Sequence, residues 1–301
     1  MNEPARLNYS THILEGLIDT DRPLGSVNDM TITTILSMFL DSAAKFQLPQ
    51  NGELLAPESY DQQLMDFFHL PFPITAFETC VSAGQITEPR TILCFEPDME
   101  ILGYLPQLLK ICLDAGTTKG AFCVFYRKTS EGWTLGDTAV FLPYENKLHK
   151  SKSDLVFEGI PFVLLADSYF SKNSSRKTMT VEKADCEDAF TILSACTYTS
   201  CEGIETVILK APEKLNQKRA KRNKKPFYDY HLLAVKPRQR QLASEENPTQ
   251  EGLPIKRASP RPHMRRGYFR TQYNKLQLLA PTTVNGTGGV MYKDYILIGG
   301  I

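Results

Sequence analysis

Apolar residues recur along parts of the chain with the period of a helix. One such run predicts a helix over about Met30–Phe46, because its apolar positions fall on one helical face. Its members are Ile32, Ile35, Leu36, Phe39 and Leu40. A second helix is expected over Cys186–Thr197, and the polar residues 1–27, broken by proline and glycine, predict a loosely held arm.

Other segments are rich in β-branched and aromatic residues between turn-forming residues, which predicts strands. In the first half these are Pro73–Val81, Arg90–Glu96, Ala121–Lys128, Trp133–Leu142 and Ile160–Leu165. In the second half they are Ile204–Leu209, Phe227–Val235, Gly267–Gln272, Gln277–Thr283 and Val290–Ile298. The mixture predicts an α+β fold.

A Ser-, Asn- and Lys-rich stretch near residue 170 suggests a boundary between two halves. We expect residues 1–170 to form a mixed half with helices and a small sheet. Residues 171–301 are expected to form a basic, β-rich half.

The composition is that of an ordinary globular protein, with 42% hydrophobic and 23% charged residues. No apolar run approaches the roughly 20 residues that cross a bilayer, and no signal peptide is evident, so we expect a soluble cytoplasmic protein without a membrane partner. Seven cysteines without a CxxC pair predict reduced thiols and neither a zinc site nor a cofactor. The carboxylates Glu96, Asp98 and Glu100 could in principle hold Mg²⁺, but no matching Asp or His set accompanies them, so a solvated strand end is the preferred interpretation.

Charge is distributed unevenly although the whole chain is neutral. Between Lys210 and Lys275 lie 18 lysines and arginines against five acidic residues, a net charge of +13, so the rest of the chain carries −13. This segment can attract an anionic partner, or it can dock on the acidic remainder of its own chain.

The first part of the basic segment interleaves cations with aromatic residues. The cations are Lys218, Arg219, Lys221, Arg222, Lys224 and Lys225, and Phe227, Tyr228 and Tyr230 follow them. Cations neutralise phosphates and aromatic rings stack on splayed bases, so this combination predicts RNA binding. The alternative is that some of these aromatic residues belong to the core.

A second basic stretch, Arg257–Arg270, packs five arginines into fourteen residues. Its candidate nucleic-acid contacts are Arg261, His263, Arg265, Arg266 and Arg270. In an extended segment the neighbours Arg265 and Arg266 leave opposite faces, so we expect one to contact the protein and the other a partner. The alternative is a solvated basic edge strand.

Two blocks of the second half form a signature when taken together. The upstream block is Lys214-Leu215-Asn216, Lys218-Arg219, Lys224-Lys225-Pro226 and Tyr230-His231-Leu232-Leu233. The downstream block is the run from Pro260 to Arg270, then Val284-Asn285-Gly286 and Tyr292-Lys293-Asp294-Tyr295, with a weaker match at Leu70-Pro71-Phe72-Pro73. In these residues the chain resembles a family of phage and mobile-element proteins that includes an anti-CRISPR directed against biogenesis of the type V-A effector nuclease. The chain departs from the expected pattern at Tyr268, where such signatures have a histidine.

The resemblance implies a protein of an infected or element-bearing bacterial host. Such a protein would suppress production of an immune effector by binding a host protein or nascent chain and its RNA. An enzyme is not the preferred interpretation, because the hydrolase, nucleotide-loop and zinc-protease motifs are missing from the sequence.

Two alternatives remain open. One is a metal-independent ribonuclease, in which His231 and His263, with Tyr268 and a nearby arginine, supply the acid, base and cation. The other is a protein-only inhibitor that docks on an acidic host protein. His69 lies among apolar residues and is interpreted as a half-buried structural histidine. The sequence does not predict the oligomeric state.

Overall fold

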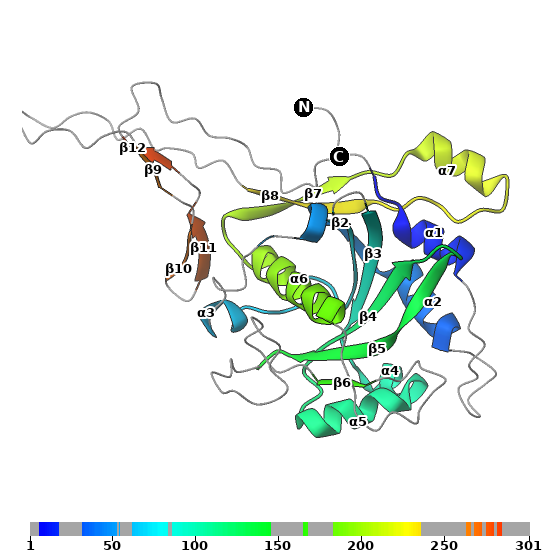
Figure 1. Ribbon diagram of the computed structural model, residues 1–301, viewed down its shortest axis with the longest axis horizontal. Helices are drawn as coiled ribbons and strands as arrows, with labels where there is room; N and C mark the ends of the chain where they lie inside the picture. Colours follow the sequence, from blue (N-terminus) through cyan, green and yellow to red (C-terminus); the bar gives the residue numbers. More distant parts are fainter. Residues whose placement is uncertain are drawn as a thin grey trace, which may run out of the picture.

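The computed structural model describes residues 6–17, 32–52, 54, 62–83, 86–145, 165–167, 183–235, 263–265, 268–272, 275–279 and 282–284. Within these ranges, eight strands form one sheet in the order β6-β5-β4-β3-β2-β1-β8-β7 (Figure 1). The strands are β1 Ala44–Gln47, β2 Ile74–Ala83, β3 Ile86–Phe95, β4 Gly120–Lys128, β5 Trp133–Pro143, β6 Leu165–Asp167, β7 Ile204–Leu209 and β8 Tyr230–Val235. Strand β1 runs parallel to both of its neighbours, and every other pair in the sheet is antiparallel.

Helices cover both faces of this sheet, which confirms the predicted α+β class. The helices that pack on the sheet are α1 Tyr9–Gly16, α2 Ile32–Ser42, α3 Gln62–Met65, α4 Met99–Tyr104, α5 Pro106–Ala115 and α6 Lys183–Thr199, with a short 3-10 turn at Gln50–Gly52. A further helix, α7 Glu213–Ala220, buries none of its residues. Side chains alternate across β4, so Phe122 and Val124 pack with α1, α2, α4 and α5. Cys123 and Phe125 point to the other face, towards α6.

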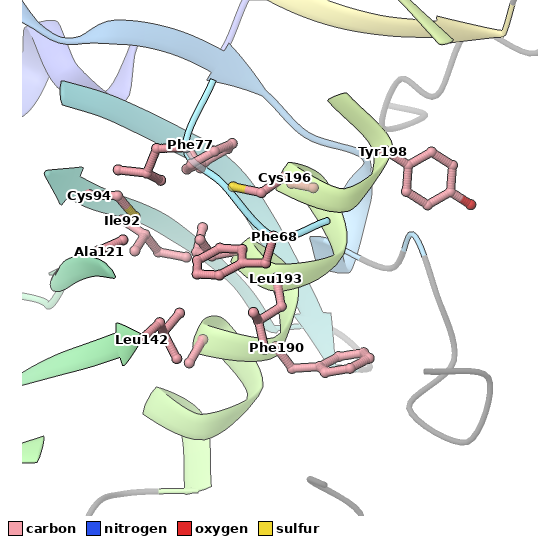
Figure 2. Packing of buried hydrophobic residues seen from close by; sticks show 14 of the residues in the cluster. Phe68, Phe77, Ile92, Cys94, Ala121, Leu142, Phe190, Leu193, Cys196 and Tyr198 are labelled. Atoms are coloured by element: carbon pink, nitrogen blue, oxygen red, sulfur yellow. The ribbon is translucent and has the colours of Figure 1, made fainter. Parts of the chain in front are cut away.

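Helix α6 fills its face of the sheet with small and apolar side chains. Figure 2 shows Leu193 and Cys196 of α6 beside Phe77, Cys94 and Ala121 of three neighbouring strands. All five residues are fully buried. Burial of this helix is therefore a large part of the hydrophobic stabilisation of the sheet.

The predicted strand pair over Pro73–Val81 and Arg90–Glu96 is confirmed as the hairpin of β2 and β3. The predicted helix over Met30–Phe46 ends earlier, at Ser42, and Phe46 belongs to a strand instead. Strand β1 is only four residues long and lies between two parallel neighbours. A short strand buried on both faces has no alternation that would distinguish it from the end of a helix.

The prediction of a loosely held N-terminal arm is wrong for residues 6–17, which contain α1. The buried Glu78 of β2 accepts hydrogen bonds from the backbone N–H groups of Tyr9 and Ser10, at 2.8 and 2.7 Å. The Ser10 hydroxyl, at 2.6 Å, and the Tyr230 hydroxyl, at 2.8 Å, donate to the same carboxylate. A carboxylate at a helix N-terminus satisfies free N–H groups and interacts favourably with the helix dipole. This cap comes from a distant strand, so local sequence does not reveal it.

Strands from both predicted halves form the same sheet. Lys45 and Phe46 of β1 pair with Tyr230 and His231 of β8. The proposed boundary at residue 170 therefore does not separate two sheets, since α6, β7 and β8 complete the sheet begun by the first half.

Four short C-terminal strands pair in two small sheets, β10 with β11 and β9 with β12. They are β9 His263–Arg265, β10 Tyr268–Gln272, β11 Lys275–Leu279 and β12 Thr282–Val284. Leu276 of β11 is buried in the core, and its carbonyl accepts a hydrogen bond from the N–H of Glu202 at 2.9 Å. The predicted strand Gln277–Thr283 is divided between β11 and β12, on either side of Pro281, which has no N–H for a ladder. The expected strand Val290–Ile298 lies outside the described residues, as does most of Ile160–Leu165.

Candidate nucleic-acid interface and adjoining cavity

Residues 210–229 form a projection that we call the basic arm. The arm leaves the sheet after β7 and returns at β8, and its two ends are adjacent because Leu209 pairs with Tyr230. Its helix α7 stands clear of the sheet in Figure 1. No residue of α7 is buried, so hydrophobic burial does not hold this helix in place.

Polar contacts hold the arm together instead. The Asn216 side chain donates to the Phe227 carbonyl and accepts from the Phe227 N–H, both at 2.8 Å. Arg219 donates from Nε to the Lys225 carbonyl at 2.6 Å, and its guanidinium carbon lies 4.2 Å from the centre of the Phe227 ring. These contacts tie α7 to the segment of the arm that returns to β8.

The arm also docks on the N-terminal helices. Arg219 Nη2 lies 2.6 Å from Glu15 Oε1, and Lys225 Nζ lies 2.9 Å from Asp41 Oδ2. Tyr228 donates a hydrogen bond to Asp41 as well. Burial alone would raise the pKa of Asp41, but the hydrogen bonds from Tyr228 and Lys225 outweigh it and lower this pKa below its ordinary value. Three residues predicted to bind nucleic acid, Arg219, Lys225 and Tyr228, therefore make contacts inside the protein.

The remaining four predicted cations of the arm face solvent. They are Lys218, Lys221, Arg222 and Lys224. None of the four makes an ion pair with a residue that the structure describes. Their charges are therefore available to an anionic partner, and the internal pairs of Arg219 and Lys225 fix the backbone from which they project.

The second predicted basic stretch is described in part. Arg261 and Arg266 lie outside the described residues, His263 and Arg265 belong to β9, and Tyr268 and Arg270 belong to β10. Strand β9 pairs with β12, whereas His231 is in β8 of the large sheet. The predicted catalytic pairing of His231 with His263, and the opposed roles of Arg265 and Arg266, remain predictions.

An open cavity of about 410 Å³ adjoins His231 on the face of the sheet that α6 covers. Strands β1, β7 and β8, the segment before β2 and the end of α6 all contribute to its lining. His231 is opposite Phe46 in the parallel pair of β1 and β8, so their rings stack with centroids 4.9 Å apart. Phe72 adds a third ring, 5.2 Å from that of His231. Burial lowers the pKa of His231 below its ordinary value, which favours the neutral imidazole.

His69 also lines this cavity, which its sequence context did not indicate. The residue is exposed, and its ring lies 4.5 Å from that of Tyr144, whose hydroxyl donates to Glu96. The interpretation of His69 as half-buried is therefore wrong, because the segment before β2 turns it outward.

Asp98, another of the candidate Mg²⁺ ligands, accepts a hydrogen bond from the Ile101 N–H at the start of α4 at 2.7 Å.

Comparison of the chain with models of protein families, with curated proteins and with solved structures gives no match. In the described part of the chain, no helix has the length and apolar character needed to cross a membrane. The described residues also contain no group of three or more His, Cys, Asp and Glu side chains arranged to hold a metal ion.

Proposed function

We propose that this protein binds RNA through the basic arm, and that this binding serves to suppress production of a host immune effector. The observation that supports RNA binding is the grouping of four exposed cations, with Lys218 on α7, which buries none of its residues, and Lys221, Arg222 and Lys224 in the segment directly after it. A projecting helix with unpaired cations suits the phosphate backbone, which dominates the affinity of most nucleic-acid complexes.

The biological part of the proposal rests on the family resemblance. The resemblance implies two partners, a nascent chain of the effector and the RNA from which that chain is translated. An RNA-binding arm beside a folded α+β body is compatible with such a role, because the body offers a separate surface for the nascent chain. The cellular test is the level of effector protein and of its mRNA, with the wild-type chain and with arm variants.

The RNA proposal predicts a defined salt dependence. Each phosphate contact on a single strand contributes a slope of about −0.7 in a plot of log affinity against log salt. Changing all four exposed arm cations to Glu should therefore make the slope shallower by about 3, and it should weaken binding at low salt. Fluorescence anisotropy of a labelled single-stranded RNA measures both quantities.

A matched control distinguishes the effect of a charge on the arm from the effect of a positive charge elsewhere on the protein. Lys119 is exposed, like Lys221, but it precedes β4, and three strands lie between β4 and β8 in the sheet. Lys221→Glu should weaken RNA binding, while Lys119→Glu should leave it nearly unchanged. Equal effects would contradict an arm-specific site. An arm that binds no RNA but is required to capture an acidic host protein would support the protein-only inhibitor, and cleavage of the RNA would support the ribonuclease.

A further inference from the structure

The cavity beside His231 combines an aromatic wall with a polar rim. The stacked rings of Phe46 and His231 form most of this wall, and Phe72 lies at its edge with 42% of its surface exposed. The wall therefore has one ring that solvent, or a ligand, can reach. Among the described residues that line the cavity, none is a carboxylate, so nothing in this lining repels an electron-rich or anionic ligand.

The rim of the cavity carries hydroxyl and imidazole groups that can form hydrogen bonds with a ligand. Thr199 donates its hydroxyl proton to the Cys196 carbonyl at 2.7 Å, and the Ser200 hydroxyl lies 3.0 Å from the Phe67 carbonyl and 3.1 Å from that of Cys196. Both hydroxyl protons therefore point to backbone carbonyls, and the oxygen lone pairs remain as acceptors. Nδ1 of His231 is buried and has no hydrogen-bond partner in the described part of the chain. Nε2 of His231 is then the nitrogen through which this ring can form a hydrogen bond with a ligand. A planar heteroaromatic ring with donors and acceptors on its edge matches this combination better than a purely apolar side chain does.

The cavity lies beside the base of the basic arm. Ile208 and His231 are paired across β7 and β8, directly beside the pair at which the arm leaves the sheet. Lys210 is the first cation of the arm, and its side chain is 75% exposed while paired with Asp229 at 2.8 Å. Both Lys210 and Asp229 lie close enough to His231 to influence its pKa, in opposite directions. The cavity therefore adjoins the two ends of the arm, at Lys210 and Asp229.

We propose that this cavity receives one unstacked base of a single-stranded RNA whose phosphates lie on the basic arm. The base stacks on the exposed ring of Phe72, and its edge meets His231 Nε2 and the hydroxyl oxygens of Thr199 and Ser200. This inference rests on the proposed RNA-binding function and adds a base-dependent site to it. The cavity volume of about 410 Å³ lies within the range of about 300–1,000 Å³ that is usual for ligand sites.

The test compares two RNA probes on the full chain. One is a labelled single-stranded RNA of about 12 nucleotides, a length within the usual site size. The other has the same length and phosphates but lacks bases. Phe72→Ala should weaken binding of the complete RNA by about tenfold, the usual scale for loss of one stacked base, and should not change binding of the abasic RNA. The matched control is Val207→Ala, because Val207 is 44% exposed on β7 but does not line the cavity.

The outcomes separate this inference from the proposed function. If reversing the arm charges weakens both probes but Phe72→Ala weakens neither, the arm binds RNA and the base site is refuted. If the arm variant binds both probes like the wild type, the proposed function itself fails. If Phe72→Ala weakens binding of a tryptophan-containing peptide and not of RNA, the cavity is a peptide site and the inference is overturned. Should Phe72→Ala lower the melting temperature, Phe72→Leu keeps the volume and removes the stacking face.

Discussion

Lys45 places an ammonium group almost entirely inside the protein, beside the junction of α2 and β1. The residue is 3% exposed, and its Nζ donates to the carbonyls of Asp41 and Ala43, each at 2.7 Å. The same nitrogen lies 3.8 Å from the centre of the Tyr228 ring. A cation in this position interacts favourably with the carbonyl end of α2 and with the aromatic face. Burial nevertheless lowers the pKa of Lys45 to about 8.

This lowered pKa predicts a stability that rises with pH. Between pH 8 and about 10.5 the unfolded chain holds the Lys45 proton and the folded chain releases it, so the free energy of unfolding increases with pH in this window. Urea unfolding at pH 8.0, 8.75 and 9.5 should show the wild type gaining about 1 kcal/mol per pH unit relative to Lys45→Met. Tyrosine and cysteine titrations occur in both proteins and cancel in this difference. Parallel pH profiles would mean that Lys45 keeps its ordinary pKa.

At the scale of an element, α7 is a helix held by side-chain contacts to backbone rather than by an apolar face. Its turn back towards β8 includes Asn223 in the left-handed region, with φ of 57°, a conformation that asparagine adopts more readily than most residues. Because so little of the arm is buried, its opening is expected to be local and independent of the sheet.

The Asn216 contacts provide a direct test of this local stability. Asn216→Ala removes both hydrogen bonds to Phe227, which should cost about 1–3 kcal/mol of the local opening free energy. Trypsin should then cleave the arm about tenfold faster or more, while the midpoint of global urea unfolding changes little. Gln217→Ala is the control, since Gln217 is exposed on the same helix. Equal cleavage rates for the two variants would show that other contacts hold the arm.

At the scale of the whole molecule, the fold depends on segments from both ends of the described chain. Strand β1 from the first half is flanked by β8 from the second, and α6 covers the face that carries Phe77 and Cys94. Glu78 joins α1, β2 and β8 through one buried carboxylate. Removal of the second half would expose the apolar cluster that contains Phe77 and Cys94, and Glu78 would lose its hydrogen bond from Tyr230.

A fragment of residues 1–170 is therefore expected not to fold cooperatively. The chain's one tryptophan, Trp133, is 5% exposed in β5 and reports on the core. The full chain should show a sigmoidal urea transition in tryptophan fluorescence, whereas the fragment should show a gradual change from an already solvated indole. A sharp transition in the fragment would establish residues 1–170 as an independent domain.

Local sequence was sufficient to predict the elements whose own residues show a clear period or a clear turn. The stripe of α2, the hairpin of β2 and β3, and the bounds of β7 were predicted because each pattern is complete within a single element. The concentration of positive charge between Lys210 and Lys275 was also evident from composition alone.

Which segments meet was visible only in the folded protein. The tertiary structure made Ala44–Gln47 a strand by placing it between β2 and β8, and it held α1 with a carboxylate from β2. It also assigned Arg219 and Lys225 to Glu15 and Asp41, and left Lys221 and its neighbours exposed. His69 and His231 reach one cavity for the same reason. Periodicity reports which face of an element is apolar, whereas strand order and ion pairing depend on distant partners that no local pattern encodes.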